Sequence, residues 1–494
     1  MLTPAAQVYI APAFILYILY YVGSVIFHPL ARIPCAHPAS LFSTLWILWK
    51  RYQGVEQEIA AVSAAHLRHG PVVRLGPREI SVGSLALATR LAQVAKLEKP
   101  NWYLPFTNFR HSNCMSSLDA RSHAIRRRRV TQPYLQSSLH RSAKMKEIMV
   151  IVLYDRLTPE LSRSSDCGVD VLPLCFAIVM DIVSAHTFGL AVAPDLTGDK
   201  GQRHIYLEAF REAITPRSMF WAQEVPLVSY LYPFTRCAWK AKSSLERNIL
   251  DLCRRAEDIS RAHQTESPGL YHFLRESSPQ HVDNNGELEI ASEVLDHLKA
   301  TGDVLSITLA HALYELSKNC QIQMQLRSEL HKSWGLRDPE GRDLPSPKSL
   351  HALPLLDAVV CETLRLRPTA PDGQPRINKS TSTVIHGCSV PMNVRISTYS
   401  YILHHDETFF ENAQEWDPSR WTSQRLNQNV HSWAYGVGAR ACLGKHMATL
   451  LLKNILAFIY TFYKTKIIDD SKWRLHGEFA RLDDALSLSF TSVS

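Results

Sequence analysis

Residues 435–448 read YGVGARACLGKHMA, and an apolar run follows them to about residue 463. Cys442 stands between two glycines, Gly438 four residues before it and Gly444 two residues after it. Glycines permit positive φ and the close approach of a flat ligand. A cysteine at a helix start also meets free N–H groups and the positive end of the helix dipole, which stabilise a thiolate. The pattern therefore predicts Cys442 as a metal ligand, the alternative being a buried structural cysteine beside a glycine turn.

The composition is that of an ordinary folded chain of 494 residues, with 46% hydrophobic and 20% charged residues. These values exclude a disordered chain and an all-membrane helix bundle. The net charge of +8 is too mild to indicate nucleic acid as a partner. Ten cysteines without a CxxC pair argue against a disulfide framework and against a cysteine-rich zinc site.

The amino terminus contains an uncharged apolar segment at residues 5–27. At about 1.5 Å per residue it is long enough to cross the hydrocarbon core of a bilayer. A cleaved signal peptide is the alternative, but no Lys or Arg precedes Arg32, and the cations that follow predict that the rest of the chain faces the cytoplasm. We therefore expect a membrane anchor at 1–28, a proline-rich hinge at 29–38 and a catalytic domain at 39–494.

The rest of the chain predicts a mainly α fold with small β-sheets in one large domain. Helical periodicity prevails between residues 85 and 365, and its clearest element is an apolar helix at 291–318, which should cross the interior. The remaining predicted elements are a β-hairpin at 72–84, a helix at 353–366, strands within 382–401, an irregular stretch at 404–432 and a final helix to about 463.

The loop around Cys442 resembles the haem-binding loop of the cytochrome P450 family, F-x-x-G-x-R-x-C-x-G. The resemblance implies the cytochrome P450 fold and heme b, with the Cys442 thiolate as the axial iron ligand. It also implies that Arg440 pairs with a haem propionate. Tyr435 stands where the family usually has Phe, which keeps an aromatic ring beside the sulfur.

Three residues elsewhere resemble the family's buried ion network. Glu362 and Arg365 in CETLRLRP are three residues apart, and Arg420 in WDPSRW follows downstream. Taken alone, such a pair is usually solvated and contributes little to stability. The resemblance implies a role in core assembly and haem incorporation, although Ser419 replaces the Glu that usually precedes Arg420.

Three further cations match positions that contact haem propionates in the family. His123 and Arg127 in SHAIRRRRV are four residues apart, with His in place of the more frequent Trp. Arg376 in QPRINKS occupies the strand region after the Glu-x-x-Arg motif. Buried carboxylates need cationic or hydrogen-bonding partners, so the charges agree with this role.

The predicted interior helix departs from the family pattern [AG]-G-x-[DE]-T-[TS]. The corresponding stretch is ATGDVL at 300–305, where Asp303 matches the acid and Val304 replaces the alcohol. Gly302 is shifted by one residue from the usual glycine. Asp303, Val304 and Thr301 are therefore the candidate catalytic positions, and Thr301 or Ser306 could replace the missing hydroxyl only if the helix kinks.

The resemblance implies a haem-thiolate monooxygenase that inserts one atom of O2 into a lipophilic small molecule. Electrons would come from NADPH through NADPH-cytochrome P450 reductase, and the enzyme would sit in the endoplasmic reticulum membrane facing the cytoplasm. The style of the sequence suggests a fungal enzyme of secondary-metabolite biosynthesis. Two alternatives stay open: a haem-thiolate enzyme that catalyses a rearrangement, dehydration or ring formation, and a non-catalytic haem-binding or membrane adaptor protein.

Overall fold

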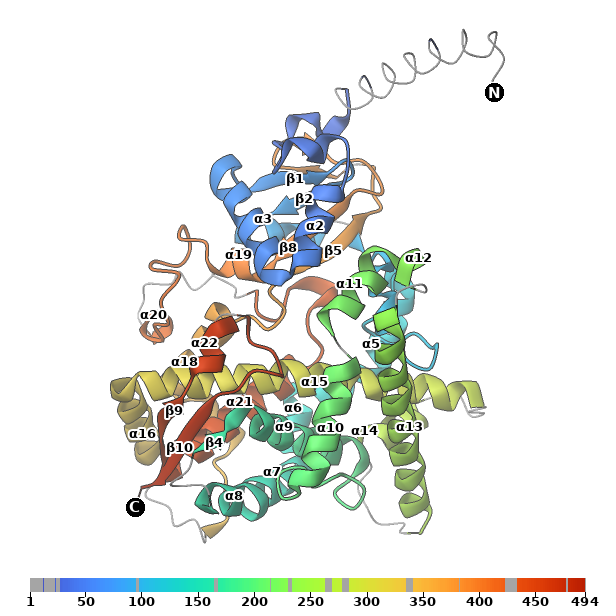
Figure 1. Cartoon of the computed structure of the whole chain (residues 1–494). Coiled ribbons are helices and arrows are strands. Elements are labelled where there is room, and N and C mark those ends of the chain that lie inside the picture. Colours follow the sequence, from blue (N-terminus) through green and yellow to red (C-terminus); the bar gives the residue numbers. More distant parts are fainter. Residues whose placement is uncertain are drawn as a thin grey trace. The chain divides into compact units, whose positions relative to one another are not determined.

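The structure is a computed structural model of the whole chain (Figure 1). It describes residues 12, 23, 27–94, 97–163, 168–213, 215–229, 233–262, 269–277, 284–334, 341–381, 383–422, 433–476 and 479–493. The chain divides into two compact units. Unit 1 comprises residues 1–100, 372–403 and 437–439, and unit 2 comprises residues 101–371, 404–436 and 440–494.

Unit 1 is built on a five-stranded sheet with the order β1-β2-β8-β5-β3. β2 and β8 run parallel, and the other neighbours are antiparallel. The predicted hairpin at 72–84 is confirmed, because β1 and β2 pair through a tight turn. The strands are β1 (Val72–Gly76), β2 (Glu79–Val82), β3 (Leu97–Glu98), β5 (Gly373–Asn378) and β8 (Arg395–Tyr399), and a small hairpin is formed by β6 (Val384–Ile385) and β7 (Cys388–Ser389).

The longer helices among the described residues of unit 1 are α2 (Leu45–Gln53), α3 (Val55–His69) and α4 (Leu85–Val94). Within the predicted hinge at 29–38, Pro29 and Pro38 each begin a short 3-10 helix, η1 (Pro29–Arg32) and η2 (Pro38–Leu41), and Ile33 and His37 between them have extended backbone. Proline suits a first helical position because its missing N–H would be unpaired there. Leu30 and Ile33 are buried, so this segment is packed into unit 1.

Unit 2 is mainly helical, as predicted. Its central helix is α15 (Asn284–Lys318), which crosses the unit in Figure 1 and begins seven residues before the predicted start at residue 291. The other helices of eight or more residues are α5 (Ala120–Thr131), α7 (Ala143–Val150), α9 (Val171–Phe188), α10 (Lys200–Ala213), α11 (Pro216–Glu224), α13 (Pro233–Ala262), α16 (Cys320–Trp334), α18 (Pro354–Leu366) and α21 (Lys445–Phe462).

The remaining elements of unit 2 are short. A three-stranded sheet has the order β4-β10-β9. Its strands are β4 (Val169–Asp170), β9 (Tyr463–Asp469) and β10 (Ser487–Ser492), and the short helices are η3 (Asn101–Phe106), η4 (Gln132–Tyr134), α6 (Gln136–Arg141), η5 (Ile151–Leu157), α8 (Thr158–Arg163), α12 (Pro226–Ser229), α14 (Leu270–Glu276), α17 (Pro347–His351), α20 (Ser419–Thr422) and α22 (Ser471–His476). α19 (Ser400–His404) crosses the boundary between the units.

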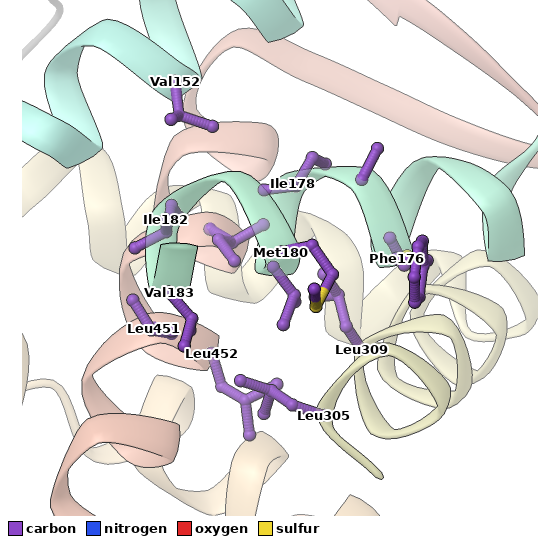
Figure 2. Close-up of a cluster of buried hydrophobic side chains, with 14 of the residues drawn as sticks. Val152, Phe176, Ile178, Met180, Ile182, Val183, Leu305, Leu309, Leu451 and Leu452 are labelled. Atoms are coloured by element: carbon purple, nitrogen blue, oxygen red, sulfur yellow. The ribbon is translucent and has the colours of Figure 1, made fainter. Parts of the chain in front are cut away.

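The core of unit 2 lies where α9, α15 and α21 meet. Figure 2 shows Met180 of α9 beside Leu309 of α15, and Val183 of α9 in the same cluster as Leu305 of α15 and Leu451 and Leu452 of α21. All of these side chains are buried. Because Cys442 immediately precedes α21, this cluster fixes the cysteine loop relative to α15.

Among the described residues, α9 is the helix long and apolar enough to span a membrane, and 89% of it is buried inside the protein. It is therefore a core helix. The predicted anchor at 1–28 falls almost entirely outside the described residues, and it stays a prediction.

Candidate functional site

The cysteine loop ends at α21, whose N-terminal cap is Gly444. The N–H of Cys442 donates to the Tyr435 carbonyl at 2.8 Å, which closes the loop on itself. Gly436 and Gly438 within the loop have φ values of +61° and +77°, a region that favours glycine. The sulfur lies 4.0 Å from the position that a Cβ on Gly444 would occupy. The loop therefore presents Cys442 two residues before the helix cap.

The electrostatics of Cys442 differ from the sequence expectation of a stabilised thiolate. Burial raises the pKa of the Cys442 thiol, although the N–H groups of Gly444 and Lys445 and the positive charge of Arg127 act in the opposite direction. The residue nevertheless keeps accessible surface. The thiol is thus largely enclosed by protein but keeps accessible surface, and a cation bound at the sulfur would stabilise the thiolate that burial disfavours.

Two of the predicted arginines join the cysteine loop to the start of α5. Arg440 donates to the carbonyls of residues 117–119 at 2.8 to 3.0 Å. Arg127 of α5 donates in return to the Ala441 carbonyl at 2.6 Å. These reciprocal contacts fix the two residues that directly precede Cys442.

The other predicted haem contacts are divided between the two units. His123 is buried on α5 one turn before Arg127, so the two lie on one helical face. The Tyr435 hydroxyl lies 3.3 Å from the Thr449 hydroxyl of α21. Arg376 belongs to β5 of unit 1, where it donates to the Pro375 carbonyl at 2.9 Å. The structure therefore brings Cys442, Arg440, Arg127, His123 and Tyr435 into one unit and places Arg376 in the other.

Glu362, Arg365 and Arg420 form one buried network. Glu362 Oε1 accepts from Arg365 Nη2 at 2.8 Å and from Arg420 Nε at 3.0 Å. Oε2 accepts from Arg365 Nε at 2.9 Å and from the Trp421 indole at 2.8 Å. The Asp417 N–H adds a further bond to Oε1 at 3.0 Å. Side-chain exposure is 0% for Glu362 and Arg365 and 6% for Arg420, so this is not a solvated pair.

The same network orders the irregular stretch that precedes the cysteine loop. Arg365 Nη1 donates to the carbonyls of His404 and Ala413 at 2.9 and 2.8 Å. Arg420 Nη1 donates to the Glu411 carbonyl at 2.8 Å. Trp421 was not predicted from the sequence as a member, and its position directly after Arg420 in WDPSRW is the only local signal for it.

α15 carries the three candidate catalytic positions on a partly accessible side. Val304 is 39% exposed and Ala300 one turn before it is also exposed, whereas residues 305–317 of the same helix are buried. Burial raises the pKa of Asp303 to about 6, and the nearby Lys299 ammonium opposes that shift. The Thr301 hydroxyl donates to the His297 carbonyl at 2.7 Å.

No described hydroxyl of this helix segment is free to replace the one missing at Val304. Ser306 is buried, and its hydroxyl donates to the Gly302 carbonyl at 2.7 Å. Gly302 itself faces the core, because a Cβ there would lie 2.7 Å from Met180 Sδ and 3.2 Å from Phe210 Cε1. The shifted glycine is therefore a packing residue that lets α9 and α10 approach α15.

A buried polar chain beside this site was missed by the sequence analysis. The Tyr134 hydroxyl lies 3.0 Å from His297 Nδ1, and His297 Nε2 lies 3.2 Å from Glu293 Oε1. Glu293 in turn accepts from the Cys114 N–H. Tyr134 is separated from His297 by 163 residues, so no local pattern could reveal this contact.

Comparison with known proteins agrees with this architecture. The cytochrome P450 family model matches residues 39–481. A protein named cytochrome P450 monooxygenase FGM1, from Gibberella zeae, is 24% identical over 82% of this chain and 82% of its own length. Cytochrome P450 monooxygenase gsfF from Penicillium aethiopicum is 23% identical over 94% of each chain. A human protein named sterol 26-hydroxylase, mitochondrial, is 31% identical over 47% of this chain and 44% of its own.

Proposed function

The chain belongs to the cytochrome P450 family and is a monooxygenase, and from this premise we propose that it inserts one oxygen atom from O2 into a lipophilic small molecule. The family implies haem with cysteine thiolate ligation. The observation that carries the proposal is Cys442, an accessible thiol enclosed by protein at a glycine-rich loop.

The residues around Cys442 fit haem. The thiol has accessible surface, and Arg127, Arg440 and His123 supply the cationic or hydrogen-bonding surroundings that two propionates need. Cys442 would hold the iron, and bound haem would supply the redox chemistry that activates O2. Arg376 is proposed as a further propionate contact on the resemblance of its sequence alone.

The protein's own contribution is to hold the loop and to deliver protons. The hydrogen bonds of Arg127 and Arg440 hold the backbone next to Cys442 and so orient its side chain. The Glu362 network holds the irregular stretch that precedes the cysteine loop. Proton delivery must pass Val304, whose apolar side chain neither donates nor accepts a hydrogen bond. Because the Thr301 hydroxyl is bonded within its own helix, Asp303 is the group left to pass a proton, through water or a substrate hydroxyl.

A second candidate function is favoured by Val304. A haem-thiolate enzyme that catalyses a rearrangement, dehydration or ring formation without oxygen insertion has less need of a proton relay. The two functions differ in stoichiometry. Monooxygenation consumes one NADPH and one O2 per product, whereas a rearrangement consumes neither.

We also propose the cellular setting that the sequence predicts. NADPH-cytochrome P450 reductase would supply the electrons, and residues 1–28 would anchor the enzyme in the endoplasmic reticulum membrane with the catalytic domain facing the cytoplasm. Relatives from Gibberella and Penicillium support a fungal enzyme. A role in secondary-metabolite biosynthesis is proposed from the style of the sequence. The mildly positive charge of +8 suits an acidic reductase.

Replacement of Cys442 tests the proposal. In the Cys442→Ala variant, the reduced, CO-treated protein should lose the thiolate-type Soret band that wild type shows. Cys320→Ala, at an exposed cysteine on α16, is the matched control and should keep the band. A Cys442→Ala protein that retains the thiolate band would show that another cysteine holds the iron.

A further inference from the structure

The accessible side of α15 is polar along one edge. Successive residues of an α-helix are about 100° apart, so Ala300 and Val304 lie within about 40° of each other and mark the centre of that side. Lys299 and Asp303 follow on one edge, one turn apart, and both keep accessible surface. Thr301 lies on the opposite edge. The centre of the accessible side is therefore apolar, with a cation and a carboxylate beside it.

Lys299 and Asp303 make few polar contacts for charged side chains that are largely surrounded by protein. The one hydrogen bond of the Lys299 ammonium to a described residue is a long one, 3.5 Å to the Asn108 amide oxygen. Within the described part of the chain, no cationic nitrogen lies within 4.0 Å of the Asp303 carboxylate and no carboxylate lies that close to Lys299. Burial lowers the pKa of Lys299 and raises that of Asp303, which shows that both charges lack full hydration.

Two such groups favour a ligand oxygen that can join them. Side chains four residues apart on a helix are neighbours, so one atom can lie within reach of both. A hydroxyl accepts from an ammonium and donates to a carboxylate at the same time. A carboxylate ligand fits less well, because the negative charges of Asp296, Glu246 and Asp303 already act on Lys299 and would repel it. A hydrocarbon would leave both charges unpaired.

We propose that the substrate is a neutral lipophilic alcohol whose hydroxyl binds between Lys299 and Asp303 while its apolar body lies against Ala300 and Val304. The inference rests on the proposed function, because it names the class of substrate for the same site. Lys299 is then a specificity-determining residue. A substrate hydroxyl bound there also lies close to Val304, where the helix has no free hydroxyl of its own.

Binding spectra of matched ligand pairs test this proposal. The haem-loaded full-length enzyme is titrated with dodecan-1-ol and dodecane, with menthol and menthane, and with dodecanoate, and the Soret shift gives each dissociation constant. Wild type should bind at least one alcohol about tenfold or more tightly than its hydrocarbon, the range expected for a hydrogen bond to a charged group. It should also prefer dodecan-1-ol to dodecanoate.

Three variants assign the preference to residues. Lys299→Met keeps a long side chain but removes the charge, and it should reduce the alcohol preference to about threefold or less. Asp303→Asn should weaken the preference in the same direction. Lys318→Met, at the exposed end of the same helix, is the control and should keep the wild-type preference.

The outcomes separate this inference from the proposed function. Equal affinities for alcohol and hydrocarbon, tighter binding of dodecanoate, or an unchanged preference in Lys299→Met would overturn the inference. If wild type gives any of these binding results but keeps its thiolate-type CO band, the monooxygenase proposal is not contradicted. Loss of that band from wild type would instead refute the proposed function.

Discussion

The buried network around Glu362 permits a prediction whose size follows from the structure. In the Glu362→Gln variant, an amide NH2 replaces one carboxylate oxygen and the negative charge is lost. If the remaining oxygen stays at Oε1, the Arg365 Nε–H and the Trp421 indole N–H both face a donor instead of an acceptor. Arg365 and Arg420 also become buried cations without a carboxylate.

The expected destabilisation is large. Breaking a buried ion pair by removing one partner costs about 3–5 kcal/mol, against a typical total stability of about 5–15 kcal/mol. The chain supplies a matched control in Glu208 and Arg211, which have the same spacing but side-chain exposures of 41% and 26%. Glu208→Gln should cost less than about 1 kcal/mol, because water already screens that pair.

Urea unfolding followed by tryptophan fluorescence, together with haem content after purification, compares the two variants with wild type. We expect Glu362→Gln to unfold at clearly lower urea and to purify with less haem, while Glu208→Gln resembles wild type. If the two variants shift the midpoint equally, the network does not hold the core as argued. A stable Glu362→Gln protein without haem would mean that the network serves haem binding alone.

Three further predictions concern protons and electrons. Burial raises the pKa of Asp303 from 3.8 to about 6, so the ionised carboxylate is less stable in the folded than in the unfolded state. The free energy of unfolding of wild type should therefore fall by up to about 3 kcal/mol as the pH rises from 3.8 to 6. The Asp303→Asn variant should not show this fall, and an unfolding midpoint that depends on pH equally in wild type and the variant would contradict the prediction. Val304→Thr should raise the product formed per NADPH on a substrate without a hydroxyl and change it little on an alcohol; equal coupling of wild type on both substrates would argue for a water route. Charge reversal of Arg128 and Lys445, both exposed, should slow reduction by the reductase most at low salt; unchanged rates across a salt series would exclude these residues.

Arg128 is preferred for that test because the structure gives its neighbours other roles. The sequence shows four consecutive arginines at 126–129 that could all be solvated. Arg126 instead forms an ion pair with Glu289 of α15, and Arg127 binds the Ala441 carbonyl. A run of arginines in the sequence does not reveal which of them form an ion pair or a hydrogen bond with a residue more than a hundred positions away.

The features that the sequence predicted well are those with local signatures. The helix at 353–366 and the hairpin at 72–84 both depend on residues a few positions apart, and their structures agree with the pattern. The glycine-flanked loop of Cys442 is equally local, but the role of Cys442 as a metal ligand stays a prediction. Resemblance to the family extended this to Glu362, Arg365 and Arg420, which the structure brings together. Their individual roles at haem stay predictions.

The features that the sequence could not reveal depend on tertiary contacts. Nothing local indicates that Gly302 admits Met180 and Phe210, or that Arg440 would bind the carbonyls of residues 117–119. The pKa of Cys442 was expected to be lowered from the helix start alone, but burial by the rest of unit 2 outweighs that effect. The start of α15 was missed because its first four residues, 284–287 (NNGE), are polar or glycine and lack the apolar period of the rest of the helix.

The burial of α9 has a consequence for how the protein is made. Its 18 residues have a mean hydropathy of 1.8, so on leaving the ribosome the segment has the length and composition of a membrane span. The helix that covers it, α15, begins at Asn284 and is synthesised on the order of 5–20 s later at ordinary elongation rates. If residues 1–28 anchor the nascent chain as proposed, α9 would be exposed to the membrane-insertion machinery during that interval. The folded position of α9 then depends on chaperones, or on early packing against α7 and α10, to keep it out of the membrane until α15 arrives.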